Sequence, residues 1–155
     1  MPIPDFVVEL RSKVGQAQLW LPGITAVVCR GEEVLLVRRS DNGQWAPVTG
    51  IVGPGEDPGV AAGRETWEET RVRVSVDRLV MVSVTPPVLH VNGDRAIYLD
   101  HAFACTWLDG EAEVGDDESV EVGWWPRDEL PPMKAELAAR IEAAFSGEER
   151  ARFES

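Results

Sequence analysis

The sequence has little cysteine and histidine, and this shortage removes two classes of protein. It holds two cysteines and two histidines in 155 residues, with no CxxC pair and no Cys/His cluster. Neither a disulfide framework nor a structural zinc site is therefore expected. Cys29 and Cys105 lie in apolar, strand-like runs. We interpret them as buried thiols of a cytoplasmic protein, since that compartment is reducing.

Basic residues are also scarce. Lys and Arg number 15 against 27 Asp and Glu, which gives a formal net charge of −12 at pH 7. A protein that binds nucleic acid without sequence preference needs a basic face that displaces counterions, and a protein that docks on anionic lipid needs one as well. The sequence therefore predicts no nucleic-acid partner and no membrane partner.

Long apolar runs are missing too. No stretch approaches the roughly 20 residues that a membrane span requires, and the first five residues do not resemble a signal peptide. Hydrophobic residues make up 44% and charged residues 27%, the balance of an ordinary globular protein. This length predicts a single domain over residues 1–155, with an N-terminal arm at 1–21 and a polar, frayed tail at 146–155.

Strand-like and helix-like segments are mixed along the chain. Hydrophobic patterning predicts strands at residues 24–29, 33–39, 72–85, 95–107 and 122–126. It predicts helices at residues 6–13, 58–70 and 128–145. Pro22-Gly23 is expected to interrupt the chain before the first strand, and Pro131-Pro132 to kink or restart the last helix. Strands around a central helix, with another helix at the end, predict the α/β class in its mixed form.

The central helix carries a group of carboxylates. Glu65, Glu68 and Glu69 share one side of it, because positions i, i+3 and i+4 are neighbours on a helix. Arg64 can offset part of their repulsion through Glu68, four residues on. Mg²⁺ and Mn²⁺ prefer such oxygen ligands, although a solvated charged helix face has the same local pattern.

Another side of this helix consists of small residues, including Gly59 and Gly63. A glycine in a helix interior costs about 1 kcal/mol relative to alanine. A helix selected for stability alone would avoid them, so we expect a close approach of this helix to the sheet at the two glycines.

A longer motif surrounds the carboxylates. Residues 50–72 closely follow G-x5-E-x7-R-E-U-x-E-E-x-G-U, where U is a bulky aliphatic residue. This resembles the box motif of the Nudix hydrolases, which cleave a nucleoside diphosphate linked to another moiety. Weaker similarity extends the resemblance to about residues 22–145. The matching positions are Gly50, Glu56, Arg64, Glu65, Glu68, Glu69 and Val72.

The resemblance implies a Nudix-type α/β/α sandwich, with a mixed sheet flanked by the box helix and the C-terminal helix. It implies Mg²⁺ as cofactor, with Mn²⁺ as a substitute, and a small-molecule nucleotide as substrate. Homodimers are common in the family, and the apolar N-terminal segment is the candidate interface. The implied metal ligands are the Gly50 carbonyl and the carboxylates of Glu56, Glu65, Glu68 and Glu69.

The resemblance also implies catalytic roles. Glu65 is a further metal ligand or the base that acts on water, and Arg64 orients it. Many family members take one more acid from a distant loop, and Glu118 is our candidate, with Glu121 as the alternate. A solvated acidic loop at residues 111–121 explains the same run of charge.

Three residues are candidates for substrate binding. Arg38 and Arg39 end a strand near the motif and can reach phosphates, but a solvated strand end explains them equally well. Trp45 can stack on a base, and ordinary packing is the alternative for it.

Two positions depart from the motif. Thr66 stands where an aliphatic residue is usual, and Arg71 stands where the second glycine is expected. Either Arg71 takes the left-handed conformation of that glycine, at a cost of about 1 kcal/mol, or the helix runs on through it. The departures leave two interpretations open besides a featureless acidic domain. One is a metal-dependent diphosphate hydrolase, and the other is a nucleotide-binding sensor domain with little turnover.

Overall fold

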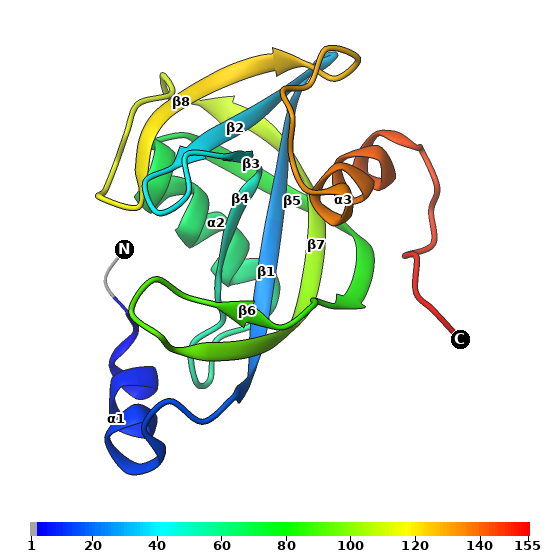
Figure 1. The fold of residues 1–155 in the computed structure, drawn as a ribbon. Helices are drawn as coiled ribbons and strands as arrows, with labels where there is room; N and C mark the ends of the chain where they lie inside the picture. Colours follow the sequence, from blue (N-terminus) through cyan, green and yellow to red (C-terminus); the bar gives the residue numbers. More distant parts are fainter. Residues whose placement is uncertain (1–2) are drawn as a thin grey trace.

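One long strand, β1 (Leu19–Arg30), is buried along much of its length and organises the fold. The computed structural model describes residues 3–155, and Figure 1 shows β1 in the middle of a bent sheet. The helices are α1 (Asp5–Val14), α2 (Pro58–Thr70) and α3 (Ala135–Phe145). The other strands are β2 (Glu33–Arg39), β3 (Trp45–Ala46), β4 (Val48–Ile51), β5 (Arg73–Val84), β6 (Val88–Leu89), β7 (Arg95–Asp109) and β8 (Ser119–Pro126).

Both edges of β1 are paired. Along one edge it runs parallel to β7, beginning with Leu19 opposite Ala96. Along the other edge, β2 pairs with it only near Arg30, and β4 pairs with it near Gly23. The sheet order is β3-β2-β1-β7-β5, with β8 beside β2 and β6 beside β7. Because β2 and β4 share one edge, β4 brings residues 48–51 next to the central strand.

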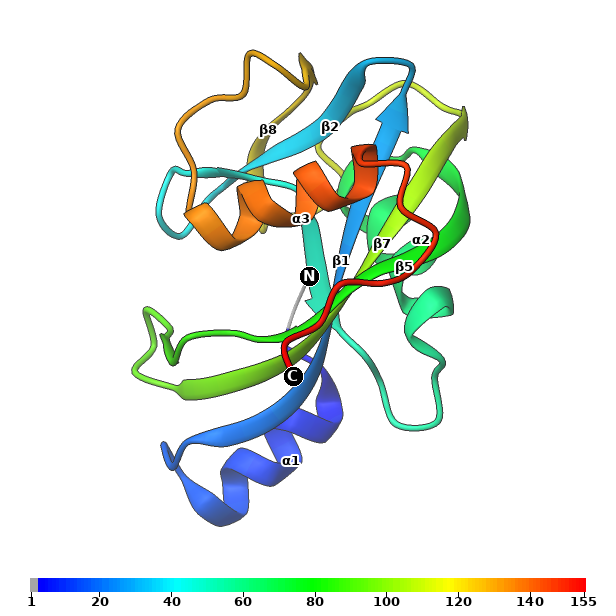
Figure 2. The same cartoon turned by 90° about the vertical axis from the view of Figure 1, so that its right-hand side faces the viewer.

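The two faces of β1 support two separate cores. Ile24, Ala26 and Val28 pack with α2 in one core, and Val27 packs with Ile141 of α3 in the other. This alternation follows from the two-residue period of a strand. Figure 2 shows α2 and α3 on opposite sides of the sheet. A strand covered on both faces has a continuous apolar sequence, as β1 does here.

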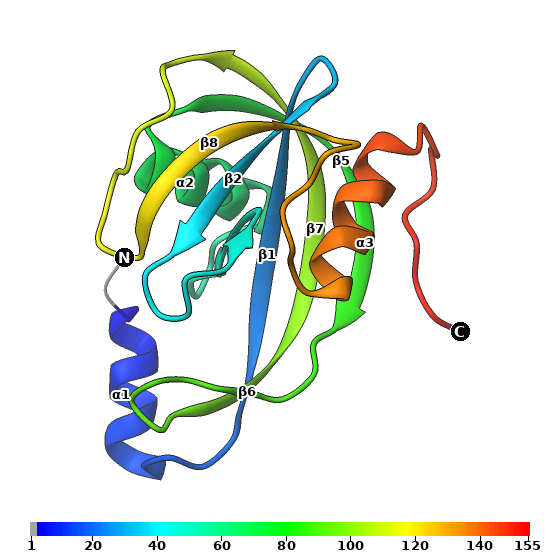
Figure 3. The same ribbon diagram turned by 45° about the horizontal axis from the view of Figure 1, so that its top comes forward.

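The N-terminal arm is docked on the end of the sheet. Val7 of α1 packs against Leu21 and Ala96 in a third, smaller core. The guanidinium of Arg11 donates a hydrogen bond to the carbonyl of Arg95 at 2.7 Å. Figure 3 shows α1 at this end of the sheet, apart from α2 and α3.

The expected fold class is confirmed, since a mixed sheet lies between the box helix α2 and the C-terminal helix α3. Cys29 and Cys105 are free thiols, and burial raises the pKa of Cys29 to about 11 and that of Cys105 to about 12. Within residues 3–155, no helix is long and apolar enough to cross a membrane.

Two expected boundaries are wrong. The chain is not interrupted at Pro22-Gly23, because β1 continues through both residues. The Pro22 carbonyl accepts a hydrogen bond from Val52, and the missing N–H of Pro22 is tolerated because β4 pairs with β1 only from Gly23 onward. The C-terminal helix begins at Ala135 rather than at residue 128, since proline lacks the N–H that a continuous helix requires.

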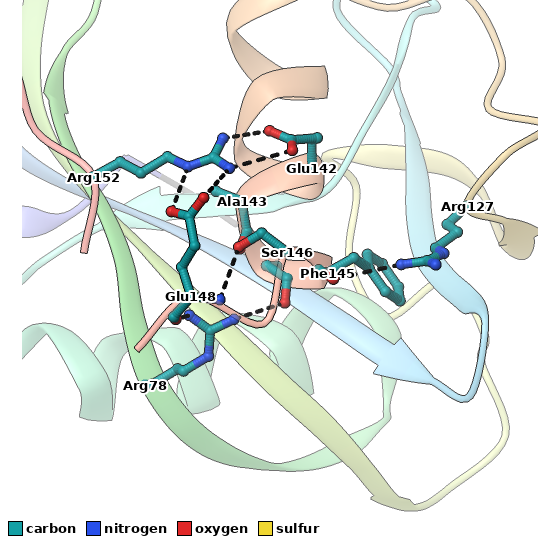
Figure 4. A network of polar contacts seen from close by, with 9 residues as sticks. Arg78, Arg127, Glu142, Ala143, Phe145, Ser146, Glu148 and Arg152 are labelled. Atoms are coloured by element: carbon teal, nitrogen blue, oxygen red, sulfur yellow. Dashed lines mark hydrogen bonds and ion pairs between the residues drawn. The ribbon is translucent and has the colours of Figure 1, made fainter. Parts of the chain in front are cut away.

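The C-terminal tail does not fray as expected. Arg152 donates its N–H to the Val80 carbonyl and accepts at its own carbonyl the Val82 N–H, so the tail lies beside the edge strand β5. Figure 4 shows the Arg152 guanidinium between the carboxylates of Glu142 and Glu148. The tail therefore covers part of a sheet edge that would otherwise be open to pairing with another chain.

We expect Arg152→Ala to release the tail from β5. Losing both ion pairs leaves the backbone bonds to Val80 and Val82 as the main attachment, so the Val82 amide should exchange with solvent roughly tenfold faster. Hydrogen exchange followed by NMR measures this rate. Arg150→Ala is the matched control, since Arg150 is exposed in the same tail. Equal Val82 rates in the parent and Arg152→Ala would show that these ion pairs do not hold the tail.

Candidate functional site

The site begins with a close contact between β4 and α2. A Cβ placed on Gly50 would lie 2.3 Å from Cδ of Glu65, which is far inside van der Waals contact. The Glu65 side chain is fully buried and lies across the backbone of β4. Position 50 must therefore be glycine for Glu65 to occupy this place.

The close approach expected at Gly59 and Gly63 is not found. A Cβ on either residue would meet only Val76 of β5, at 3.9 Å, which is an ordinary contact. Within the motif, the close contact at a glycine is instead between Gly50 of β4 and Glu65 of α2. The helix buries Ala61, Ala62, Thr66 and Thr70 without needing those glycines.

Arg64 gathers three carboxylates. Its Nε donates to Glu56 at 2.7 Å, and its Nη1 donates to Glu65 at 2.9 Å and to Glu68 at 3.2 Å. Its Nη2 also reaches the Ile51 carbonyl at 3.2 Å, which ties the cluster to β4. These bonds hold the pKa of the Glu56 carboxyl below its ordinary value and that of the Arg64 guanidinium above it. We call Glu56, Glu65, Glu68 and Glu69 the carboxylate cluster.

The buried members of the cluster lack enough positive charge. Burial raises the pKa of Glu65 to about 7, against the opposing effect of Arg64. Burial, with the carboxylates of Glu118 and Asp116 nearby, raises the pKa of Glu69 to about 9. The Oε2 atom of Glu65 is buried without a hydrogen-bond partner. The site therefore favours a proton or a metal cation beside these oxygens.

The donors suit a hard divalent cation. Carboxylate and carbonyl oxygens are the ligands that Mg²⁺ and Mn²⁺ prefer, and Mg²⁺ keeps several waters, so one or two carboxylates are enough to bind it. No three acidic, histidine or cysteine side chains within residues 3–155 already surround a common point. Arg64 accounts for this arrangement, because it already occupies oxygens of Glu56, Glu65 and Glu68.

A cavity of about 610 Å³ adjoins the cluster. Gly50, Glu118 and Arg39 line one part of it, and Trp45 lines it while packing edge-on against Trp125 at 5.2 Å. A second hollow of about 530 Å³ is lined by Glu56, Arg64 and Gly53, and the two hollows share Ile51. The motif thus borders both hollows, through Gly50 on one side and Glu56 and Arg64 on the other, while Glu65, Glu68 and Glu69 line neither of them.

Only one of the two candidate acids and one of the two candidate arginines line the cavity. Glu118 lines the cavity, and burial raises its pKa. Glu121 lies outside the cavity lining, 3.5 Å from Arg38, and both side chains are about half exposed. Arg39 lines the cavity and is held by Asp41 at 2.8 Å. The structure therefore brings Glu118 and Arg39 to the cluster and leaves Glu121 and Arg38 on the outside of β2 and β8.

A buried polar group beside the cavity was not expected from the sequence. Arg140 of α3 donates to Thr25 at 3.1 Å and lies 3.4 Å from Asp100, and burial raises the pKa of Asp100 despite this ion pair. Arg140 and Asp100 also line the cavity. The available signal was a single arginine among the apolar positions of the last helix.

A second polar pair near the cavity was also missed. The His90 ring bonds the Tyr98 hydroxyl at 2.9 Å, and both residues line the cavity. No spacing rule connects them, because β6 and β7 place them side by side only in the folded sheet.

The two departures from the motif are accommodated differently. Thr66 is fully buried, and its hydroxyl donates to the Ala62 carbonyl at 2.8 Å, so it fills an aliphatic position without leaving a polar group unpaired. Arg71 ends the helix in the left-handed conformation, with φ 57°, which is the first of the two expected alternatives.

Comparison with known proteins agrees with this geometry. A sequence profile described as NUDIX domain matches residues 20–145. A MutT-like protein of Streptomyces ambofaciens is 35% identical over 126 residues, which cover 80% of this chain and 76% of that protein. An NAD-capped RNA hydrolase NudC of Chromobacterium violaceum is 32% identical over 77% of this chain, but only 44% of that protein is covered.

Solved structures show the same fold. A UDP-X diphosphatase superposes with a TM-score of 0.66 at 24% identity, covering 92% of this chain and 69% of the other.

We expect Gly50→Ala to destabilise the fold by about 1–3 kcal/mol, because the added methyl group forces Glu65 off β4. Gly63→Ala is the matched control in the same motif, and it should stabilise the protein by up to about 1 kcal/mol through helix propensity. Denaturant unfolding measures both changes. Equal effects of the same sign would contradict the proposed contact.

The metal-free protein should become less stable as pH rises. Glu65 and Glu69 have pKa values of about 7 and 9 when folded, so the folded state keeps protons that the unfolded chain releases near its ordinary carboxyl pKa of about 4.3. The free energy of unfolding should fall from about pH 5 and level off above about pH 9. Thermal unfolding in a chelating buffer measures this slope.

Glu69→Gln is the control for that slope, because it removes one of the two titrating carboxyls. The variant should show a shallower fall in Tm between about pH 5 and 9 than the parent. Added Mg²⁺ should raise the parent Tm more at high pH than at low pH, since the metal competes with protons. An unchanged slope in the variant would show that Glu69 is not the group that titrates.

Proposed function

This chain belongs to the Nudix family of hydrolases, and from that premise we propose that it hydrolyses the pyrophosphate linkage of a small nucleoside diphosphate derivative with Mg²⁺ as cofactor. Mn²⁺ is the expected substitute, because it accepts the same oxygen ligands. A derivative that joins two moieties through the diphosphate, as ADP-ribose does, is a better candidate than a nucleoside triphosphate.

The observation that carries this proposal is that residues of the motif border two hollows. Glu56 and Arg64 line one hollow, Gly50 and Glu118 line the other, and Ile51 belongs to both. A diphosphate at this junction leaves one hollow for each attached moiety. A nucleoside triphosphate would need only one of them.

The cavity supports a nucleoside as one of the moieties. Its volume of about 610 Å³ lies within the usual range for small-molecule sites, which is about 300–1,000 Å³. The rings of Trp45 and Tyr98 on its walls can stack on a base. The polar atoms of Asp100 and Arg140 supply hydrogen-bonding groups beside it. The names of the similar proteins, which include a diphosphatase and a hydrolase of NAD-capped RNA, agree with this substrate class.

The residues divide the chemistry between them. The Gly50 carbonyl and the carboxylates of Glu68 and Glu69 would hold the metal, with Glu56 as an outer ligand. The metal, when bound, neutralises the diphosphate and polarises its phosphoryl oxygen. Without a cation the cluster would repel an anionic substrate. A bound cation would offset this repulsion, so a net charge of −12 is compatible with such a substrate.

Glu65 is the candidate base. Arg64 donates to its Oε1, which fixes the carboxylate and leaves Oε2 buried without a partner. That oxygen is a free acceptor, but it is closed to solvent here, so a water must enter beside it before the carboxylate can take its proton. Glu118 reaches the same region from the loop before β8 and lines the cavity, which supports its role as the distal acid.

We expect Glu69→Gln and Glu118→Gln to lower kcat on the order of a hundredfold or more while the fold persists. Glu121→Gln should keep the parent rate, since its carboxyl lies outside the cavity lining and pairs with Arg38. A panel of ADP-ribose, nucleotide sugars, NADH and nucleoside triphosphates with Mg²⁺ or Mn²⁺, followed by release of phosphate-bearing products, measures these rates.

Two outcomes of the same panel would count against the proposal. A parent protein that binds these nucleotides but turns over none of them would identify a nucleotide sensor instead of an enzyme. A Glu69→Gln variant as fast as the parent would place the metal elsewhere.

A further inference from the structure

We propose that Arg71 is a positioning residue that holds Glu118 at the candidate site by tying the acidic loop to the end of α2. The acidic loop, expected at residues 111–121, spans residues 110–118 in the structure, because β7 ends at Asp109 and β8 begins at Ser119. This inference rests on the proposed function only in taking Glu118 as part of the site. The tether itself is a property of the fold and can be tested without turnover.

The backbone of Arg71 is costly for a residue with a side chain. Its φ of 57° and ψ of 19° are left-handed, and it is the one residue other than glycine with a positive φ within residues 3–155. Glycine adopts this conformation at a lower cost, because it has no Cβ. Stability of the helix end alone therefore favours glycine at position 71, which points to a role for the arginine side chain.

The side chain reaches the acidic loop. Nη2 of Arg71 donates a hydrogen bond to the Gly115 carbonyl at 2.7 Å. The guanidinium also lies 5.7 Å from the centre of the Trp67 ring on the same helix, which limits its freedom to swing away. A glycine at position 71 could make neither contact.

The loop backbone completes the attachment. The N–H of Gly115 donates to the Glu69 carbonyl at 2.8 Å, and the N–H of Glu113 donates to the Thr70 carbonyl at 3.0 Å. These are carbonyls of the last helical turn, which have no partner within the helix. Arg71 holds the carbonyl of Gly115 while α2 holds its N–H, so this one peptide segment is fixed from both sides.

Gly115 lies too close to α2 for any side chain. A Cβ on it would meet the Glu68 carbonyl oxygen at 2.0 Å, and backbone atoms cannot move aside cheaply. Only two residues, Asp116 and Asp117, separate Gly115 from Glu118, and the Glu118 N–H donates to the Asp116 side chain at 3.0 Å within that short span. The clamp on Gly115 therefore limits where Glu118 can lie on the α2 side, while the Ser40 N–H holds the Glu118 carbonyl at 2.8 Å on the β2 side.

A purely structural role for Arg71 predicts a different outcome. If Arg71 served only to end the helix, Arg71→Gly would raise stability and leave activity unchanged. If it positions Glu118, Arg71→Gly should keep or raise Tm, because the left-handed strain is relieved, and should still lower activity. The activity should therefore fall without a fall in Tm.

The experiment compares the parent with Arg71→Gly, Arg71→Lys and Arg73→Gln. Arg71→Gly should lower kcat about tenfold to a hundredfold with KM nearly unchanged, because a displaced acid weakens the chemical step. Arg71→Lys should restore part of kcat, since one ammonium donor can reach the Gly115 carbonyl. Arg73→Gln is the matched control, because Arg73 also stacks on Trp67, at 4.9 Å, and neighbours the same helix end. It should keep the parent kcat.

Hydrogen exchange of the Gly115 amide is the readout that does not depend on turnover. Arg71→Gly should accelerate it at least tenfold, and Arg73→Gln should not. An active parent with an Arg71→Gly variant of equal kcat would overturn the proposal, as would a joint loss of kcat and Tm. A parent that turns over no substrate would reject the proposed function, and the Gly115 exchange rates would then decide on the tether alone.

Discussion

Repulsion among carboxylates that are packed together and partly withdrawn from water is the constraint on which this structure depends. Glu56, Glu65 and Glu68 meet at the Arg64 guanidinium where β4 approaches α2, and Arg39 supplies a weaker opposing charge to Glu69. The arrangement persists because the fold around it is stiff. Gly50 leaves room for Glu65, and two apolar cores clamp β1 from both faces. The remaining negative charge favours the binding of a cation. A metal-dependent hydrolase uses such a cation to neutralise the charge of an anionic substrate.

The sheet topology places this charge next to a cavity. β2 and β4 pair with the same edge of β1, and the segment that joins them contains β3. Residues from β2, β3 and β4 therefore line a common cavity. Trp45 and Arg39 come from one side and Gly50 from the other. Glu118, the proposed distal acid, comes from the loop before β8, far along the chain. Each contribution comes from a different element, so the site exists only in the assembled sheet.

Much of the fold could be predicted from the sequence, because local patterns determine it. The apolar run in β1 was sufficient to predict a buried strand, and the carboxylate spacing on α2 was sufficient to predict a helix with its glutamates on one side. Long-range contacts were not visible in the same way. The ion pair of Arg140 with Asp100 and the attachment of the tail through Arg152 join segments distant in sequence. The glycines of α2 misled the prediction, because the close contact is made by Gly50 on the facing strand.

The parallel pairing of β1 with β7 has a consequence for how the chain acquires this structure. Leu19 lies beside Ala96, so the first strand of the sheet finds its long neighbour only after most of the intervening chain has been synthesised. Contacts of such large sequence separation slow folding, because a long loop must close before they form. Until β7 and then α3 have left the ribosome, the apolar run of β1 lacks a partner along one edge and cover on one face. Exposed apolar surface and unpaired strand edges favour aggregation, so the nascent chain is vulnerable during this interval.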